Sequence, residues 1–197
     1  MNILIIQARC GSSRLHNKVM LKINEKEILK IVYDRCKLSK KVDKIIVATS
    51  TNIEDNKIYD LCNKYSIDCY RGDERDLINR YYYLSKLLNT KTIIRVTSDC
   101  PYIDHKIMDN MLDIFIEKKL DYIYNTDEND NKIYPEGSDI EIFNFSTLEY
   151  LMFNEFETRE HASGVLRFNK KYLNIFKIYE YDCKFNNLLY KNNLIGI

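Results

Sequence analysis

The chain alternates between short apolar runs and stretches with helical spacing. Continuous runs of β-branched residues and leucine predict strands buried on both faces at residues 3–6, 44–49 and 92–97, with a shorter strand at 67–70. Apolar residues at i, i+3 and i+4 predict helices over 26–39, 76–88 and 105–118, and another beginning near Asn52 or Asp55. This order predicts an α/β fold with a Rossmann-like, mostly parallel sheet flanked by helices.

The pattern is less regular in three places. Residues 19–23 indicate a short extended piece, and residues 121–136 are polar and rich in turn formers. Residues 137–143 alternate like a strand, Ser146 to Glu149 can open a helix as a capping box, and residues 172–181 contain strand-like pieces. We expect a single domain over residues 1–197, with the segment 121–145 reaching across a pocket or onto a second subunit.

Composition narrows the class of protein. With 45% hydrophobic and 30% charged residues the chain is globular, and a net charge of +1 argues against a protein that coats nucleic acid. The six cysteines form no C-x-x-C pair, which favours free thiols in a reducing compartment. The first apolar run ends at Gln7, too short for a signal peptide or a membrane span. We therefore expect a cytoplasmic protein with no membrane partner.

The stretch QARCGSSR follows the first predicted strand and carries Arg9 and Arg14, with Lys18 just beyond. Ligands of open α/β sheets bind beyond the carboxyl ends of the strands, so this stretch is a candidate grip for phosphates. It matches neither G-x-x-x-x-G-K-[ST] nor G-x-G-x-x-G. Taken alone, the stretch fits an anion site and an ordinary solvated basic loop equally well.

Acidic residues at the same edge suggest a cation. Asp99 directly follows the strand TIIRVT, and Asp139 and Glu141 form a D-x-E pair whose side chains would share one face of a strand. Mg²⁺ is commonly held by one or two carboxylates together with phosphate oxygens. The alternatives are a turn cap for Asp99 and a solvent-exposed strand face for the D-x-E pair.

Two further segments have open interpretations. Arg71, followed by Asp73, Asp76 and Arg80, would border a base or ribose, or would form local ion pairs of little energetic value. Arg159 and His161 could contact an acceptor substrate. The favoured interpretation is that they instead form structural pairs with other residues of the protein.

Six stretches carry a resemblance to a known family: IIQARCGSSRL with Lys18, IIVATSTN, YRGDERDLINRYY, IIRVTSDCPYID, YPEGSDIEIF and TREH. They occur in the same order from residue 3 to about residue 161. The chain resembles the cytidylyltransferase family, in particular the branch of spore coat polysaccharide biosynthesis protein F, which is related to acylneuraminate and Kdo cytidylyltransferases.

The resemblance implies a nucleotide-diphospho-sugar transferase type of fold and an often dimeric enzyme. Its substrates would be CTP and a sugar acid or phosphorylated acceptor, its cofactor Mg²⁺, and its products a CMP- or CDP-linked sugar and pyrophosphate. By this resemblance the catalytic residues would be Arg14, Lys18 and Asp99. The nucleotide would contact Gln7, Ala8, Arg9, Gly11, Ser12, Ser13, Arg14 and Lys18. Of these, Gln7 and Ala8 would lie near the cytosine, where backbone groups can read the base edge, and Arg71 and Thr97 would be near the base or ribose. The metal would bind Asp99, Asp139 and Glu141.

The chain departs from the family pattern at two positions. His16-Asn17 stand where Pro-Gly is usual, and Ser98 stands where glycine is usual. Two rival functions stay open: a glycosyltransferase using a nucleotide-sugar donor, and a non-catalytic nucleotide-binding module of a polysaccharide pathway. The sequence does not choose between a sugar hydroxyl and a phosphate as the attacking group.

Overall fold

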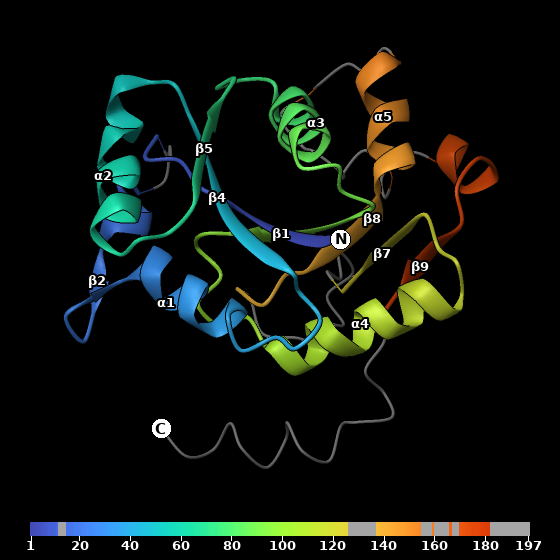
Figure 1. Cartoon of the computed structure of the whole chain (residues 1–197), viewed down its shortest axis with the longest axis horizontal. Helices are drawn as coiled ribbons and strands as arrows, with labels where there is room; N and C mark the ends of the chain where they lie inside the picture. Colours follow the sequence, from blue (N-terminus) through green and yellow to red (C-terminus); the bar gives the residue numbers. More distant parts are fainter. Residues whose placement is uncertain (12–14, 126–136, 155–158, 160–165, 167–169, 182–197) are drawn as a thin grey trace.

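A seven-stranded sheet forms the centre of the computed structural model (Figure 1). The structure describes residues 1–11, 15–125, 137–154, 159, 166 and 170–181. The strand order is β5-β4-β1-β6-β8-β7-β9, and β8 runs antiparallel to its neighbours while the other pairs are parallel. The strands are β1 Asn2–Gln7, β4 Lys44–Ser50, β5 Cys69–Gly72, β6 Thr92–Thr97, β7 Tyr122–Tyr124, β8 Glu141–Asn144 and β9 Ile178–Glu180. This confirms the predicted, mostly parallel α/β sheet.

Helices cover both faces of the sheet. One face packs against α1 (Ile28–Cys36), α2 (Asn56–Lys64) and α4 (His105–Glu117), and the other against α3 (Leu77–Leu87) and α5 (Phe145–Phe153). Figure 1 shows α3 and α5 on one side of β1 and α1 and α4 on the other. A small hairpin of β2 (Lys22–Ile23) and β3 (Lys26–Glu27), and the short 3₁₀ helices η1 (Lys18–Met20), η2 (Ile53–Asp55) and η3 (Lys170–Asn174), complete the described elements.

The central strand shows why the sheet needs two helical layers. Leu4 and Ile6 of β1 pack into the core under α1, α2 and α4, whereas Ile3 and Ile5 pack into the core under α3 and α5. All four side chains are fully buried, because alternate residues of a strand point to opposite faces. No helix in the described part of the chain is long and apolar enough to cross a membrane.

Most predicted elements are confirmed within a few residues, but three expectations were wrong. The polar stretch 121–136 begins with β7, which pairs with β8 because its tyrosines and isoleucine bury against the sheet. Residues 19–23 are divided between η1 and β2. The capping residue of α5 is Asn144 and not Ser146, since the Asn144 side chain accepts a hydrogen bond from the Thr147 N–H at 2.7 Å.

The α5 cap gives a stability prediction. Replacing Asn144 by alanine removes the acceptor for Thr147 N–H and the Asn144 Nδ2 bond to Asp121 at 2.9 Å, so we expect a loss of about 1–2 kcal/mol. Urea unfolding monitored by circular dichroism measures the loss. Ser146→Ala is the matched control and should change stability by less than about 0.5 kcal/mol. A larger loss for Ser146→Ala than for Asn144→Ala would contradict this assignment of the cap.

Candidate functional site

A buried carboxylate anchors the basic loop that follows β1. Asp55 is 3% exposed and accepts hydrogen bonds from the backbone N–H groups of Cys10, at 2.7 Å, and of Ser50, at 3.3 Å, as well as from the Ser50 hydroxyl. At the far end, the Asn17 N–H donates to the Cys10 carbonyl at 3.0 Å. The loop therefore leaves and rejoins the edge of the sheet at fixed points. Ser12, Ser13 and Arg14 lie outside the described residues.

Cys10, within this loop, is a core residue and not a nucleophile. Its side chain is fully buried, and burial together with the charge of Asp55 raises the pKa of the thiol to about 11. The thiol is therefore protonated at neutral pH, and a protonated thiol is a poor nucleophile. Its neighbour Gly11 is exposed to solvent.

Asn17 has a backbone conformation that glycine adopts most easily. Its backbone lies in the left-handed region, with φ 56° and ψ 23°, immediately before η1. Glycine adopts this conformation without a Cβ penalty, and asparagine is among the few other residues that tolerate it. The replacement of the usual glycine by Asn17 therefore keeps the turn that places Lys18.

Lys18 and Asp99 meet across the carboxyl edge of the sheet. Lys18 Nζ lies 3.0 Å from Asp99 Oδ2, and the two side chains are 39% and 41% exposed. Partial burial alone would raise the pKa of Asp99, but hydrogen bonds from Thr97 and Lys18 outweigh it and hold the pKa below its ordinary value. Asp99 is thus an ionised carboxylate at neutral pH, partly open to solvent and paired with the ammonium group of Lys18.

Asp139 lies close to the same place. Gly137, with φ 83°, fits against Pro101 and Cys100, and the Tyr102 N–H donates to the Gly137 carbonyl at 3.0 Å. Burial raises the pKa of the Cys100 thiol to about 11, and the charges of Asp139 and Asp99 add to this effect, so both carboxylates are near that thiol. Asp99 and Asp139, forty residues apart in the sequence, thus both lie in the neighbourhood of Cys100.

Glu141 has a different environment. Its carboxylate lies 2.8 Å from Arg95 NH1, and the two side chains are 3% and 13% exposed. Arg95 Nε in turn donates to Gln7 Oε1 at 3.1 Å. The carboxylate that we expected to bind a metal is instead the counter-ion of a largely covered arginine, because β8 pairs with β6 in a register that places Arg95 opposite Glu141.

A cavity of about 200 Å³ opens between β1, β6 and the start of α3. It is lined by Gln7, Arg9, Glu74, Arg75, Leu77, Arg80 and Arg95. Four of these residues are arginines and one is an acid, so the cavity attracts anions and groups that accept hydrogen bonds. The Ser98 N–H donates to the Gln7 backbone carbonyl at 2.9 Å, so the chain that leads into Asp99 lies beside one residue of the cavity.

Arg71 of β5 and Arg80 of α3 bind backbone carbonyl groups within the protein. Arg80 is 1% exposed and donates to the carbonyls of Asp73, at 2.8 Å, and of Glu74, at 3.2 Å, so it fixes the cavity rim. Arg71 donates to the carbonyls of Ser50 and Asn52, both at 2.9 Å. These bonds replace the local ion pairs that the sequence suggested, and they occupy the fork of Arg71 that we expected near a base or ribose.

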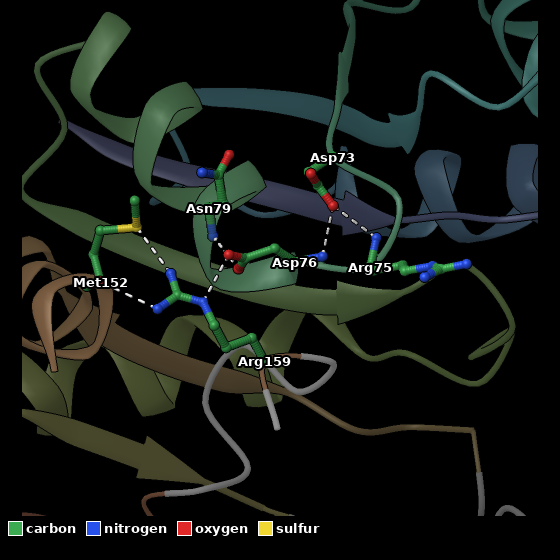
Figure 2. A network of polar contacts seen from close by, with 6 residues as sticks. All are labelled: Asp73, Arg75, Asp76, Asn79, Met152 and Arg159. Carbon is green, nitrogen blue, oxygen red and sulfur yellow. Dashed lines mark hydrogen bonds and ion pairs between the residues drawn. The ribbon is translucent and has the colours of Figure 1, made fainter. Parts of the chain in front are cut away.

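Arg159 joins the two helices on the α3 side of the sheet (Figure 2). Its Nε lies 2.7 Å from Asp76 Oδ2, and its NH1 donates to the Met152 carbonyl of α5 at 3.2 Å. Asp76 also caps α3, accepting from the Asn79 N–H at 2.8 Å. This is the structural pairing that the sequence favoured for Arg159. His161 lies outside the described residues.

The remaining expected contacts are near the cavity. Arg9 lines it, and Thr97 ends β6 beside Asp99. The backbone N–H of Ala8 donates to the Ala48 carbonyl at 3.0 Å, which continues the sheet pairing of β1 with β4.

The sequence analysis missed Arg95 and the rim residues Glu74, Arg75 and Leu77. Arg95 did give a signal, because it is the one charged residue in the buried strand TIIRVT. A charge inside an apolar strand must find a partner, since burial without one is costly. The rim residues gave no comparable signal.

Comparison with known proteins agrees with this architecture. A solved cytidylyltransferase from Leptospira borgpetersenii superimposes with a TM-score of 0.83 at 33% identity, covering 93% of this chain and 76% of that one. A solved CMP:2-keto-3-deoxy-manno-octonic acid synthetase shares the fold, with a TM-score of 0.70 at 16% identity over 99% and 98% of the two chains. The fold is that of the nucleotide-diphospho-sugar transferases, and the enzyme class is nucleotidyltransferase. The cytidylyltransferase family model matches residues 3–182, so the chain belongs to the cytidylyltransferase family.

Three of the relatives by sequence differ in how much of their own length the match covers. An uncharacterised protein of Methanocaldococcus jannaschii is 38% identical over 89% of this chain and 69% of its own length. Spore coat polysaccharide biosynthesis protein SpsF of Bacillus subtilis is 31% identical over 62% of this chain. An 8-amino-3,8-dideoxy-manno-octulosonate cytidylyltransferase of Shewanella frigidimarina is 33% identical over 57%. The matches span 52% and 46% of the latter two proteins, about half the length of each.

The left-handed turn at Asn17 gives a test of how the loop is built. Asn17→Gly should be neutral or stabilising, whereas Asn17→Val should cost about 1–2 kcal/mol because a β-branched residue disfavours positive φ. Thermal unfolding of both variants checks this. Equal stability of the glycine and valine variants would show that residue 17 does not adopt this conformation in solution.

The Arg159–Asp76 pair gives a test of structural against substrate roles. Asp76→Asn keeps a capping side chain but removes the charge, and Arg159→Met removes the cation. In a double-mutant cycle we expect a coupling free energy of about 1 kcal/mol in urea unfolding. CTP affinity, measured by calorimetry, should be unchanged. Coupling near zero, with a large rise in the KM of an acceptor for Arg159→Met, would instead favour contact with the acceptor.

Proposed function

We propose that this chain transfers a cytidylyl group from CTP to an oxygen of a sugar acid or of a sugar or polyol phosphate, releasing pyrophosphate. The proposal rests chiefly on one observation: the arginine-lined cavity includes Gln7 and Arg9 at the end of β1, and the Lys18–Asp99 pair lies at the end of the neighbouring strand β6. Family membership supports cytidine as the nucleoside. The names of relatives support a sugar-acid acceptor and a place in surface polysaccharide or glycoconjugate synthesis.

The acidic residues fit a divalent cation that arrives with the nucleotide. Asp99 and Asp139 supply two carboxylates, and among the described residues no third His, Cys, Asp or Glu joins them as a preformed cage. Mg²⁺ is typically held in this way, by one or two carboxylates completed by substrate phosphates and water. We therefore assign Asp99 and Asp139 as its ligands and leave out Glu141, which Arg95 neutralises. When bound, Mg²⁺ supplies Lewis-acid polarisation of the phosphate under attack.

In the proposed reaction an acceptor oxygen attacks the α-phosphorus of CTP. A new oxygen–phosphorus bond forms as the bond from the α-phosphorus to the bridging oxygen breaks, and pyrophosphate leaves with the electron pair. Lys18, Arg9 and the loop residue Arg14 stabilise the negative charge that grows on the leaving group. Asp55 and Asn17 hold the two ends of this loop, at Cys10 and before Lys18.

The two classes of acceptor differ in where a proton goes. A sugar hydroxyl loses its proton to a base as it attacks, whereas an ionised phosphate oxygen attacks without losing one. Both acceptors would lie on the Asp99 side of the nucleotide. We assign the cavity between β1, β6 and α3 to the cytosine ring, because its lining is rich in hydrogen-bond donors and is adjacent to the phosphate loop. We further propose a cytoplasmic homodimer as the working form.

Asp99→Asn tests the proposed site directly. The substitution keeps the shape of the side chain but removes its charge, so CTP-dependent pyrophosphate release should fall by about 10²-fold or more. Asp113→Asn is the matched control, because Asp113 forms an exposed pair with Lys41 far from the cavity, and it should keep full activity. Circular dichroism should show both variants folded. Near-normal turnover of a folded Asp99→Asn protein would remove Asp99 from the site.

One activity screen can identify the acceptor class and distinguish the proposed activity from the two rival functions. Pyrophosphate release is measured with CTP, Mg²⁺ and a panel of sugar acids and sugar or polyol phosphates. Turnover with one acceptor class would identify the substrate. Free UDP released from UDP-sugars, without pyrophosphate from CTP, would favour a glycosyltransferase. CTP binding in calorimetry with no turnover on any acceptor would favour a non-catalytic binding module.

A further inference from the structure

Gln7, Arg95 and Glu141 form a polar row on one face of the sheet. Arg95 is in β6, which lies between β1 and β8. Its neighbour on the parallel strand β1 is Ile5, and its neighbour on the antiparallel strand β8 is Glu141. Ile93 and Phe143 lie two residues from Arg95 and Glu141 along their strands, hence on the same face of the sheet, and they pack under α3 and α5. The row therefore faces the α3 side, where the cavity opens.

The chemistry of Arg95 decides how Gln7 is oriented. A guanidinium has only donors, so the Gln7 atom that lies 3.1 Å from Arg95 Nε must be the carbonyl oxygen of the carboxamide. Arg95 is itself held 2.8 Å from the Glu141 carboxylate. Burial would lower the pKa of Arg95, but Glu141 outweighs that effect and raises it, so the guanidinium stays charged. The orientation of the Gln7 amide is thus determined by a permanently charged donor.

Because the Gln7 oxygen accepts a hydrogen bond from Arg95, the NH₂ of the same amide is available to donate to a ligand. Gln7 lines the cavity, and no bond from its Nε2 to another residue occurs in the described part of the chain. At about 200 Å³ the cavity is smaller than the roughly 300–1,000 Å³ typical of pockets that hold whole ligands. It therefore suits a single ring, with the Gln7 NH₂ as a donor in its lining.

We propose that Gln7 determines the choice of base, with its NH₂ donating a hydrogen bond to N3 of cytosine; this rests on the proposed function above. Cytosine and uracil both present an acceptor at O2. They differ at position 4, where cytosine carries a donor, and at N3, where cytosine is an acceptor and uracil carries a hydrogen. A fixed donor can favour cytosine over uracil only at N3. Arg95 and Glu141 act as positioning residues, since they keep the amide from turning over.

The composition of the chain offers a direct measurement. Gln7 is the only glutamine among the 197 residues, so ¹⁵N-glutamine labelling gives one side-chain NH₂ signal in an NMR spectrum. CTP should shift this signal, whereas pyrophosphate, which has no base, should leave it nearly unchanged. An unmoved signal in a sample where calorimetry shows CTP bound would overturn the inference while leaving the proposed function intact. Absence of any CTP binding would overturn both.

Substitutions provide the second test. Gln7→Glu keeps an oxygen for Arg95 but replaces the donor by an acceptor, so the ratio of CTP to UTP affinity should fall by about 10-fold or more. Repulsion between the new charge and the triphosphate weakens the binding of CTP and UTP equally, so it leaves the ratio of their affinities unchanged. Gln7→Leu, which removes the donor without adding charge, should lower the ratio as well. Asn63→Asp, an exposed amide-to-acid change on α2, is the control and should leave it unaltered.

Glu141→Gln tests the positioning role. Without its counter-ion Arg95 no longer holds the Gln7 oxygen firmly, so the CTP to UTP ratio should fall in the same direction as in Gln7→Glu. The double variant Glu141→Gln/Gln7→Leu should have the same CTP to UTP ratio as Gln7→Leu alone, because it has no Gln7 amide for Arg95 to orient. Unchanged ratios in both folded Gln7 variants would overturn the assignment, whatever Glu141→Gln does.

Discussion

The parallel pairing of β1 with both β4 and β6 is the constraint on which the site depends. Because these strands run in one direction, Gln7, Ser50 and Thr97 end at the same edge, and the loops that follow them must meet there. The antiparallel β8 adds the remaining element, since it brings Asp139 to this edge from the opposite direction. Groups from segments far apart in the sequence thus converge without any single long motif.

Buried charges fix this edge in two ways. Asp55 accepts hydrogen bonds from backbone and hydroxyl donors, and so sets the position of a loop. Arg95 has a carboxylate partner and an amide neighbour, and so sets the orientation of a side chain. Each charge would be costly without these partners, and each therefore enforces one local geometry. By contrast, the Lys18–Asp99 pair is open to solvent and is free to exchange partners when a ligand binds.

Much of the fold follows from the sequence, because long apolar runs and helical spacing are local signals. The parallel sheet and the helices over residues 28–36, 77–87 and 105–117 arise in this way. β7 was missed because a three-residue strand of tyrosines and isoleucine is defined by its partners and not by its own pattern. The same limit applies to the site. The alternation that put Asp139 and Glu141 on one face said nothing of Arg95, whose position opposite Glu141 depends on the register between β6 and β8.

That register also bears on how the chain is synthesised. β8 is made more than forty residues after β6, so the outer edge of β6 is without its neighbour while the intervening chain is translated. An unpaired, apolar strand edge is a template for aggregation, and a charge within the strand is a common protection against it. Arg95 is the residue that interrupts TIIRVT. The guanidinium that lines the finished cavity is thus also the kind of charge that disfavours edge-to-edge association before β8 pairs with β6.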